Sequence, residues 1–189
     1  MKIILASGSP RRRALLKDLG LAFDVYSPNA DETHIPDEAP EALCVRLSRL
    51  KAESAAQKFP DAVVIAADTI VVIDGQILGK PANRHDAVRM LTMLQGREHE
   101  VLTGVCVISH GKVLSCAERT LVKFRALTND EITAYSETGE CDDKAGAYAV
   151  QGKGALLVES ISGDYFNVVG LPLCRLGIML PEAGVNLLA

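Results

Sequence analysis

The sequence contains no apolar run long enough to cross a bilayer. The longest runs, such as residues 62–67, fall far short of the roughly 18 to 20 residues that a membrane span needs. The start of the chain, residues 1–6, is also too short for the core of a signal peptide. We therefore expect a cytoplasmic protein without a membrane partner.

Paired cysteines are also lacking. The five cysteines are odd in number, and no two have the C-x-x-C spacing, which argues against a disulfide framework and a structural zinc site. We expect small core residues in a reducing compartment. They are Cys44, Cys106, Cys116, Cys141 and Cys174.

An excess of positive charge is the third absence. The net charge is -4, from 20 Lys and Arg against 24 Asp and Glu, so no global field would hold a long polyanion. We therefore expect no nucleic-acid polymer as a partner. A small anion fits better, because three arginines, residues 11–13, stand together near the N-terminus.

What is present is an ordinary globular composition. The chain has 189 residues, of which 48% are hydrophobic and 23% charged, which excludes disorder and fits one domain over residues 1–189, or two small lobes. Helices alternate with strands and with long hairpins, so we predict an α/β fold whose mixed, twisted sheet is flanked by helices. The expected strands cover residues 2–6, 23–26, 62–67, 69–73, 76–78, 98–109, 112–124 and 155–160, and the expected helices cover 11–19, 40–58, 83–94, 128–138 and 171–180.

The first candidate site lies where the first strand turns into the first helix. Such helix starts bind anions through free backbone N–H groups and the helix dipole. Ser9 as N-cap and Pro10 at N1 explain part of the pattern without function. The expected buried face of the helix is defined by Leu15, Leu16 and Leu19. Arg12 projects along that face and predicts a buried anion, Arg11 lies at its edge, and Arg13 points away. A solvated basic patch is the alternative.

A second candidate is Asp68, a lone carboxylate inside an apolar run. Burial without a partner costs several kcal/mol, so Asp68 ends a strand, is paired, or both. In open α/β sheets ligands bind beyond the carboxyl ends of strands, and we expect Asp68 there beside the end of the first strand. A turn aspartate that caps local amides is the alternative.

Weaker signals come from four single residues. Asp31 and Glu32 lie in a polar loop, where exposed acids are common. Lys51 stands at the edge of a helical leucine stripe, where a snorkelling lysine is the simplest interpretation. Lys80 fits an ordinary turn.

Residues 143–154, the glycine-rich segment, form the last candidate. Its three glycines and three alanines permit close approach of the backbone to a ligand. Gln151 has a side-chain amide that both donates and accepts hydrogen bonds, which suits the edge of a base. A tight loop built for packing alone is the alternative.

Eight motifs run in order over nearly the whole chain: residues 5–12, 31–33, 51–52, 67–69, 79–81, 99–104, 143–152 and 163–172. Together they resemble the Maf family of nucleoside triphosphate pyrophosphatases. The resemblance implies a two-lobed fold similar to inosine triphosphatases with a substrate cleft between the lobes, a homodimer, and a divalent metal. The branch that the chain resembles acts on dTTP and UTP.

The resemblance also implies roles for individual residues. Asp68 is the expected general base, directly or through metal-bound water, and Lys80 is expected to offset charge on the leaving pyrophosphate. Glu32 and Asp68 are the expected ligands of Mg²⁺ or Mn²⁺. The expected substrate-binding residues are Ser7, Arg11, Arg12, Lys51, Thr69 and Gln151.

Two other functions compete with this one. A nucleotide-sensing regulator of septum formation would act through a protein partner, and a generic phosphatase would lack the base specificity. The sequence leaves open whether dTTP, UTP or a modified pyrimidine nucleotide is the main substrate.

Overall fold

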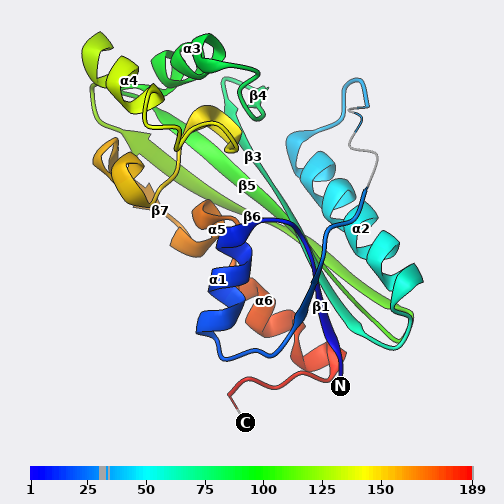
Figure 1. Cartoon of the computed structure of the whole chain (residues 1–189). Coiled ribbons are helices and arrows are strands. Elements are labelled where there is room, and N and C mark those ends of the chain that lie inside the picture. The colour runs from blue at the N-terminus through cyan, green and yellow to red at the C-terminus, as the bar shows by residue number, and fades with distance from the viewer. Residues whose placement is uncertain (30–32, 34, 189) are drawn as a thin grey trace. The chain divides into compact units, whose positions relative to one another are not determined.

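The computed structural model describes residues 1–29, 33 and 35–188 (Figure 1). In chain order the first elements are β1 (Ile3–Ala6), α1 (Pro10–Asp18), β2 (Asp24–Tyr26), α2 (Pro40–Lys58), β3 (Val63–Ile73), β4 (Gln76–Leu78), α3 (Arg84–Leu94) and β5 (Glu98–Ser109). The remaining elements are β6 (Lys112–Phe124), α4 (Asn129–Ser136), β7 (Val158–Ser162), α5 (Tyr165–Val169) and α6 (Leu173–Met179), with short 3₁₀ turns at Ala145–Ala147, Gly152–Leu156 and Pro181–Ala183. Among the described residues, no helix is both long and apolar enough to cross a membrane.

The sheet is mixed, as predicted. Its strand order is β2-β1-β3-β5-β6-β7, and β4 pairs with β3. β1 runs parallel to both β2 and β3, whereas the β3–β4 and β6–β7 pairs are antiparallel. The predicted hairpin turns are confirmed, since Asp74-Gly75 and His110-Gly111 both have two successive positive φ angles, as type I′ turns require.

The chain forms two compact units. Unit 1 comprises Met1–Asp68, Thr103–Glu118 and Gly170–Ala189, and unit 2 comprises Thr69–Leu102 and Arg119–Val169. Each unit has its own core of buried side chains. In unit 1 this core includes Ile4, Ala6, Ala52, Val64 and Cys106. In unit 2 it includes Leu91, Val122, Phe124, Tyr135 and Tyr148.

At the end of α1 the buried face differs from the predicted one. Leu15 and Leu16 are buried, but Leu19 is 39% exposed. The helix ends in a Schellman motif, because the N–H of Gly20, in the left-handed region, donates to Lys17 and the N–H of Leu21 donates to Leu16. This turn buries Leu21 in place of Leu19.

The two strands predicted over residues 62–67 and 69–73 form one strand, β3. Strand β3 runs without interruption through Asp68, so the prediction that this residue ends a strand is wrong. Ten of the eleven residues of β3 are buried, and a charged side chain persists inside such a strand because it is paired.

The last part of the chain also differs from the prediction. Residues 155–156 belong to a 3₁₀ turn, so β7 starts later, at Val158, and ends at Ser162. Helix α5 was not predicted, because five residues are too short to show helical periodicity. Helix α6 starts at Leu173, after Pro172 as N-cap, rather than at residue 171.

Local capping signals were reliable in unit 2. The Asn83 side chain accepts from the Asp86 N–H at the start of α3, and Thr128 with Glu131 forms the capping box of α4.

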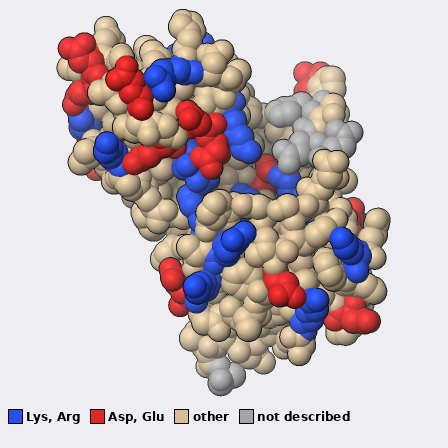
Figure 2. All heavy atoms as spheres, viewed as in Figure 1, with Lys and Arg blue, Asp and Glu red and all other residues tan. Residues whose placement is uncertain are grey.

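Helices α3 and α4 pack against each other (Figure 1). Acidic side chains gather over α4 in Figure 2. Asp130 and Glu131 lie in its first turn, where they complement the positive end of the helix dipole.

Candidate active site

The turn between β1 and α1 places a serine hydroxyl beside an arginine. The Ser7 Oγ, nearly buried, accepts hydrogen bonds from the Ser9 N–H and from Arg12 Nη1, both at 3.2 Å. Ser9 is the N-cap residue and Pro10 is at N1, as predicted, but the Ser9 side chain makes no capping bond. The first turn is therefore fixed by Ser7, one of the expected substrate-binding residues.

The three neighbouring arginines differ in burial, as predicted from the helical geometry. Arg11 and Arg12 are half-buried, and Arg13 is exposed. The Nε of Arg12 also donates to the carbonyl oxygen of Gly170 at 2.7 Å. Two of its partners are thus neutral oxygens, which fix the direction of the guanidinium through its rigid fork.

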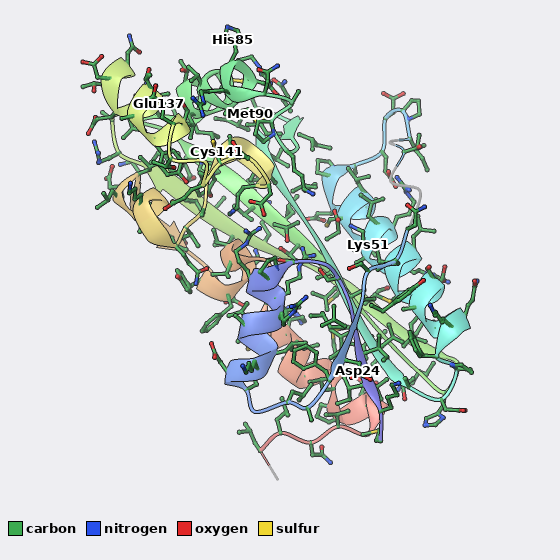
Figure 3. The ribbon with its side chains drawn as sticks, in the orientation of Figure 1. Asp24, Lys51, His85, Met90, Glu137 and Cys141 are labelled. Carbon is green, nitrogen blue, oxygen red and sulfur yellow. The ribbon has the colours of Figure 1, made fainter. Side chains whose placement is uncertain are left out.

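A lysine and an aspartate form the second part of the site in unit 1. Lys51 Nζ lies 2.5 Å from Asp68 Oδ1, and the two side chains are only 13% and 12% exposed. Lys51 extends from α2 (Figure 3) and Asp68 from β3. Such a nearly buried, charge-assisted hydrogen bond holds each of the two side chains in one position.

The strand register puts Asp68 beyond the end of β1. Ile65 of β3 is opposite Leu5 of β1, and β1 ends one residue later, at Ala6. Asp68 therefore stands at a position where β3 continues and β1 has ended. The expected location beyond the carboxyl end of the first strand is confirmed, although β3 itself does not end there.

Close packing of α2 on β5 sets the position of Lys51. A Cβ on Gly104 would lie 2.1 Å from the carbonyl oxygen of Cys44 and 2.6 Å from the Val45 nitrogen, so only glycine permits this approach. Burial raises the pKa of the Cys44 thiol to about 12, and the negative charge of Asp68 adds to the effect. The negative charge of Asp68 thus acts on a thiol of α2, the helix that carries Lys51.

The remaining described candidates belong to unit 2. Thr69 directly follows Asp68 in β3 and is half-buried. Lys80 is exposed just after β4, and Gln151 is exposed at the start of a 3₁₀ turn. The structure thus brings Ser7 to Arg12 and Lys51 to Asp68 by direct contact.

The structure also describes all five cysteines. All five are free, and Cys44, Cys106 and Cys141 are buried as expected, whereas Cys116 is half-buried and Cys174 exposed. Burial raises the pKa of Cys106 to about 12, which keeps this thiol protonated.

The predicted metal ligands are only partly described. Asp31 and Glu32 lie outside the described residues. Within the described part of the chain, no cluster of three or more His, Cys, Asp or Glu side chains could hold a metal ion. Asp68 offers one carboxylate with hard oxygen donors, which fits Mg²⁺, since this ion usually takes one or two carboxylates and completes its shell with water and substrate phosphates.

Sequence reasoning missed the two interactions that organise these side chains. The Lys51–Asp68 pair had a signal, because Lys51 continues the four-residue spacing of Leu43 and Leu47 and so faces the sheet. The bond from Arg12 to Gly170 had none, since 158 residues separate the two partners.

Comparison with known proteins identifies relatives over almost the whole chain. A family model described as Maf-like protein matches residues 2–183. The protein named dTTP/UTP pyrophosphatase of Symbiobacterium thermophilum is 49% identical over 97% of this chain and 94% of its own length. The proteins of the same name from Halalkalibacterium halodurans and Pyrococcus furiosus are 50% and 49% identical, covering 92% and 98% of this chain and 91% and 97% of their own.

A solved structure also aligns with part of the chain. The structure of the Staphylococcus aureus Ham1 protein is 14% identical, covers 66% of this chain and 72% of that one, and has a TM-score of 0.49.

Proposed function

Because this chain belongs to the Maf family, as its motifs predicted, we propose that it is a nucleoside triphosphate pyrophosphatase. Its substrates are dTTP and UTP, the nucleotides in the names of relatives that are about half identical over nearly the full length. The observation that carries the proposal is the nearly buried Lys51–Asp68 pair beyond the end of β1.

In the proposed reaction a water oxygen attacks the α-phosphorus of the substrate. Asp68 accepts the proton of this water, and the bond between the α-phosphorus and the α–β bridging oxygen breaks. The products are the nucleoside monophosphate and pyrophosphate, which leaves with the bridging oxygen. The Lys51 ammonium, 2.5 Å from Asp68 Oδ1, holds the carboxylate that acts as the base in one position.

Phosphoryl transfer depends mainly on positioning and on neutralising charge. We assign this work to the cationic side chains at the start of α1 and after β4. Arg11 and Arg12 hold phosphate oxygens, the latter with a guanidinium already oriented by Ser7 and Gly170. Lys80 offsets the charge of the leaving pyrophosphate, and Thr69 contributes to substrate binding.

A divalent cation, Mg²⁺ or Mn²⁺, completes the proposal. Asp68 is the described residue that would hold it, and Glu32 is the second ligand that the family resemblance implies. When bound, the ion neutralises negative charge on the triphosphate and orients it.

Recognition of the base is assigned to Gln151. Thymine and uracil share one pattern of donors and acceptors, and cytosine reverses part of it with its amino group. A site built for one pattern leaves buried polar groups unpaired against the other, which gives strong discrimination.

The family resemblance also supports a homodimer in the cytoplasm. Sedimentation of the purified chain would test the dimer, with a monomer at micromolar concentration as the contrary outcome.

The deciding experiment is pyrophosphate release from a panel of nucleoside triphosphates, with and without Mg²⁺. We expect kcat/KM for dTTP and UTP to exceed that for CTP and the purine triphosphates by at least about 100-fold, typical for hydrogen-bond-based discrimination. Gln151→Glu should reduce this preference, and Gln57→Glu, the same change on an exposed residue of α2, should not. Equal kcat/KM for CTP and UTP in the unmodified protein would contradict the assignment.

A further inference from the structure

A histidine and a tyrosine meet inside the core of unit 2. The His99 Nε2 lies 2.8 Å from the Tyr148 hydroxyl, and both side chains are at most 5% exposed. Each ring packs edge-on against the other and against Phe124. Burial lowers the pKa of His99 to about 4 and raises that of Tyr148, so both groups are neutral and one donates to the other.

Stability alone does not account for this buried polar pair. Among the residues that the structure describes, His99 Nδ1 has no hydrogen-bond partner although it is buried. A buried polar atom without a partner destabilises a fold, and apolar side chains of the same shape avoid that loss. What a hydrogen bond adds over apolar packing is a fixed direction.

Tyr148 directly follows the strained part of the glycine-rich segment. Gly146 and Ala147 have φ angles of +68° and +59°. For alanine this left-handed conformation is unfavourable and persists only where surrounding contacts impose it. The buried Tyr148 ring and its bond to His99 are such contacts, one residue away.

The same segment connects the two unit 2 residues assigned to the substrate. The Gly146 N–H donates to the carbonyl oxygen of Gly79, the residue before Lys80, at 3.1 Å. On the other side of Tyr148, the Ala149 N–H donates to the Tyr135 hydroxyl at 3.1 Å, and Gln151 follows two residues later. Tyr148 is thus the buried anchor between the Lys80 turn and the exposed Gln151.

We propose that His99 and Tyr148 are a positioning pair that determines base specificity, by locking the glycine-rich segment in the conformation that presents Gln151 to the pyrimidine. This inference rests on the proposed function, because it concerns how that site selects its base. Neither residue touches the substrate. Their effect passes through the backbone from Tyr148 to Gln151.

The test is Tyr148→Phe, which removes one hydroxyl and keeps the ring. We expect the ratio of kcat/KM for dTTP to that for CTP to fall about tenfold or more, since small displacements of a positioned group have effects of this size. Tyr165→Phe, the same change on an exposed side chain of unit 2, should leave the ratio unaltered. A purely structural defect lowers the active fraction and reduces both values equally, so an unchanged ratio overturns the proposal.

Substitutions of His99 provide the second test, which also serves if Tyr148→Phe does not fold. Glutamine reaches as far as the imidazole Nε2 and keeps a polar atom near the Tyr148 hydroxyl, whereas asparagine is one methylene shorter. We expect His99→Gln to retain the dTTP preference and His99→Asn to lose it. Equal ratios in these two variants overturn the proposal.

Hydrogen exchange separates this inference from the proposed function. If the unmodified protein releases no pyrophosphate from dTTP, the proposed function fails, and the pair is judged by its effect on the backbone. Tyr148→Phe should then accelerate amide exchange at residues 146–151 by about tenfold while exchange in α3 is unchanged. Equal exchange at residues 146–151 in the two proteins overturns the positioning role.

Discussion

The candidate residues of the two units differ in where they stand and in how they are held. In unit 1 Asp68 lies within a strand, Lys51 within a long helix, and Arg12 in the first turn of another helix. In unit 2 Lys80 and Gln151 are exposed residues of turns. An ion pair joins Lys51 to Asp68, and hydrogen bonds to Ser7 and Gly170 hold Arg12. Lys80 and Gln151 instead adjoin backbone that is held by hydrogen bonds of Gly146 and Ala149.

This difference matches the tasks proposed for Asp68 and Arg12 in unit 1 and for Gln151 in unit 2, whereas Lys80 is proposed to neutralise charge from a turn. Charge neutralisation and proton transfer require groups held close to one geometry, which regular elements provide. Selection among bases needs adaptable polar groups, which loops on a rigid scaffold commonly supply. We therefore expect substitutions in unit 1 to affect turnover or folding most, and those around the glycine-rich segment to affect selection.

The largest effect should follow the loss of the carboxylate in unit 1. Asp68→Asn should lower kcat by about 10² to 10⁴-fold, because it removes the proposed base. It should also lower the melting temperature, because the nearly buried Lys51 ammonium loses the carboxylate that it contacts at 2.5 Å. Steady-state kinetics with dTTP and thermal unfolding measure the two effects.

A second substitution separates those effects. Adding Lys51→Met to Asp68→Asn should restore much of the melting temperature without restoring turnover, since it removes the nearly buried cation that Asp68 had paired but returns no base. The matched control is Glu182→Gln, which breaks an exposed pair with Lys112 and should change little. An Asp68→Asn protein that keeps more than half of its kcat refutes the role of Asp68.

Gly104→Ala should be the most damaging change for stability in unit 1. The new methyl would overlap the backbone of α2 at Cys44, and we expect a loss of about 3 kcal/mol in the free energy of unfolding. Displacing α2 should also lower turnover, because this helix carries Lys51. The control is Gly177→Ala in α6, where nothing lies within 4 Å of the added methyl and a helical alanine stabilises by about 0.5 to 1 kcal/mol. Similar urea midpoints for the two variants would show that the contact between β5 and α2 tolerates the added methyl group.

Through His99 of unit 2, the stability of the protein should fall as the pH is lowered. The pKa of His99 is about 4 in the folded protein, below the roughly 6.5 of an unfolded chain. As the pH falls below 6.5, the unfolded chain binds a proton that the folded protein does not. The free energy of unfolding should therefore decrease by about 3 kcal/mol between pH 6.5 and pH 4 from this group alone. Urea titrations across this range should show a shallower decrease for His99→Gln, and an identical decrease would remove His99 as its source.

The smallest expected effect comes from substituting the arginines of α1, where Arg12 is compared with Arg13. Arg12→Ala should lower kcat/KM for dTTP by about 10 to 100-fold, the value of charge-assisted hydrogen bonds of roughly 1.5 to 3 kcal/mol. Arg13→Ala should change it less than twofold, because this side chain is exposed. Arg12→Lys keeps the charge but loses the fork that reaches Ser7 and Gly170, so it should recover only part of the activity. Equal losses from Arg12→Ala and Arg13→Ala would contradict the geometric distinction.

The sequence by itself determined what depends on near neighbours in the chain. The Asn83 cap, the Thr128 capping box and the Asp74-Gly75 turn follow from side chains and backbone angles a few residues apart. Helix α2 has the predicted bounds, residues 40–58, because its proline start and apolar stripe are both local signals. The family motifs likewise pointed to Ser7, Arg12 and Asp68 before any contact was known.

Only the tertiary structure decided which partner each polar side chain has. Lys51 meets Asp68 across 17 residues, His99 meets Tyr148 across 49, and Arg12 meets Gly170 across 158. The same contacts explain why β3 continues through a charged residue and why an alanine stays in a left-handed conformation. Hydrogen bonds and ion pairs form over about 3 Å in space, and sequence periodicity shows which face of an element is buried but not which atom lies opposite.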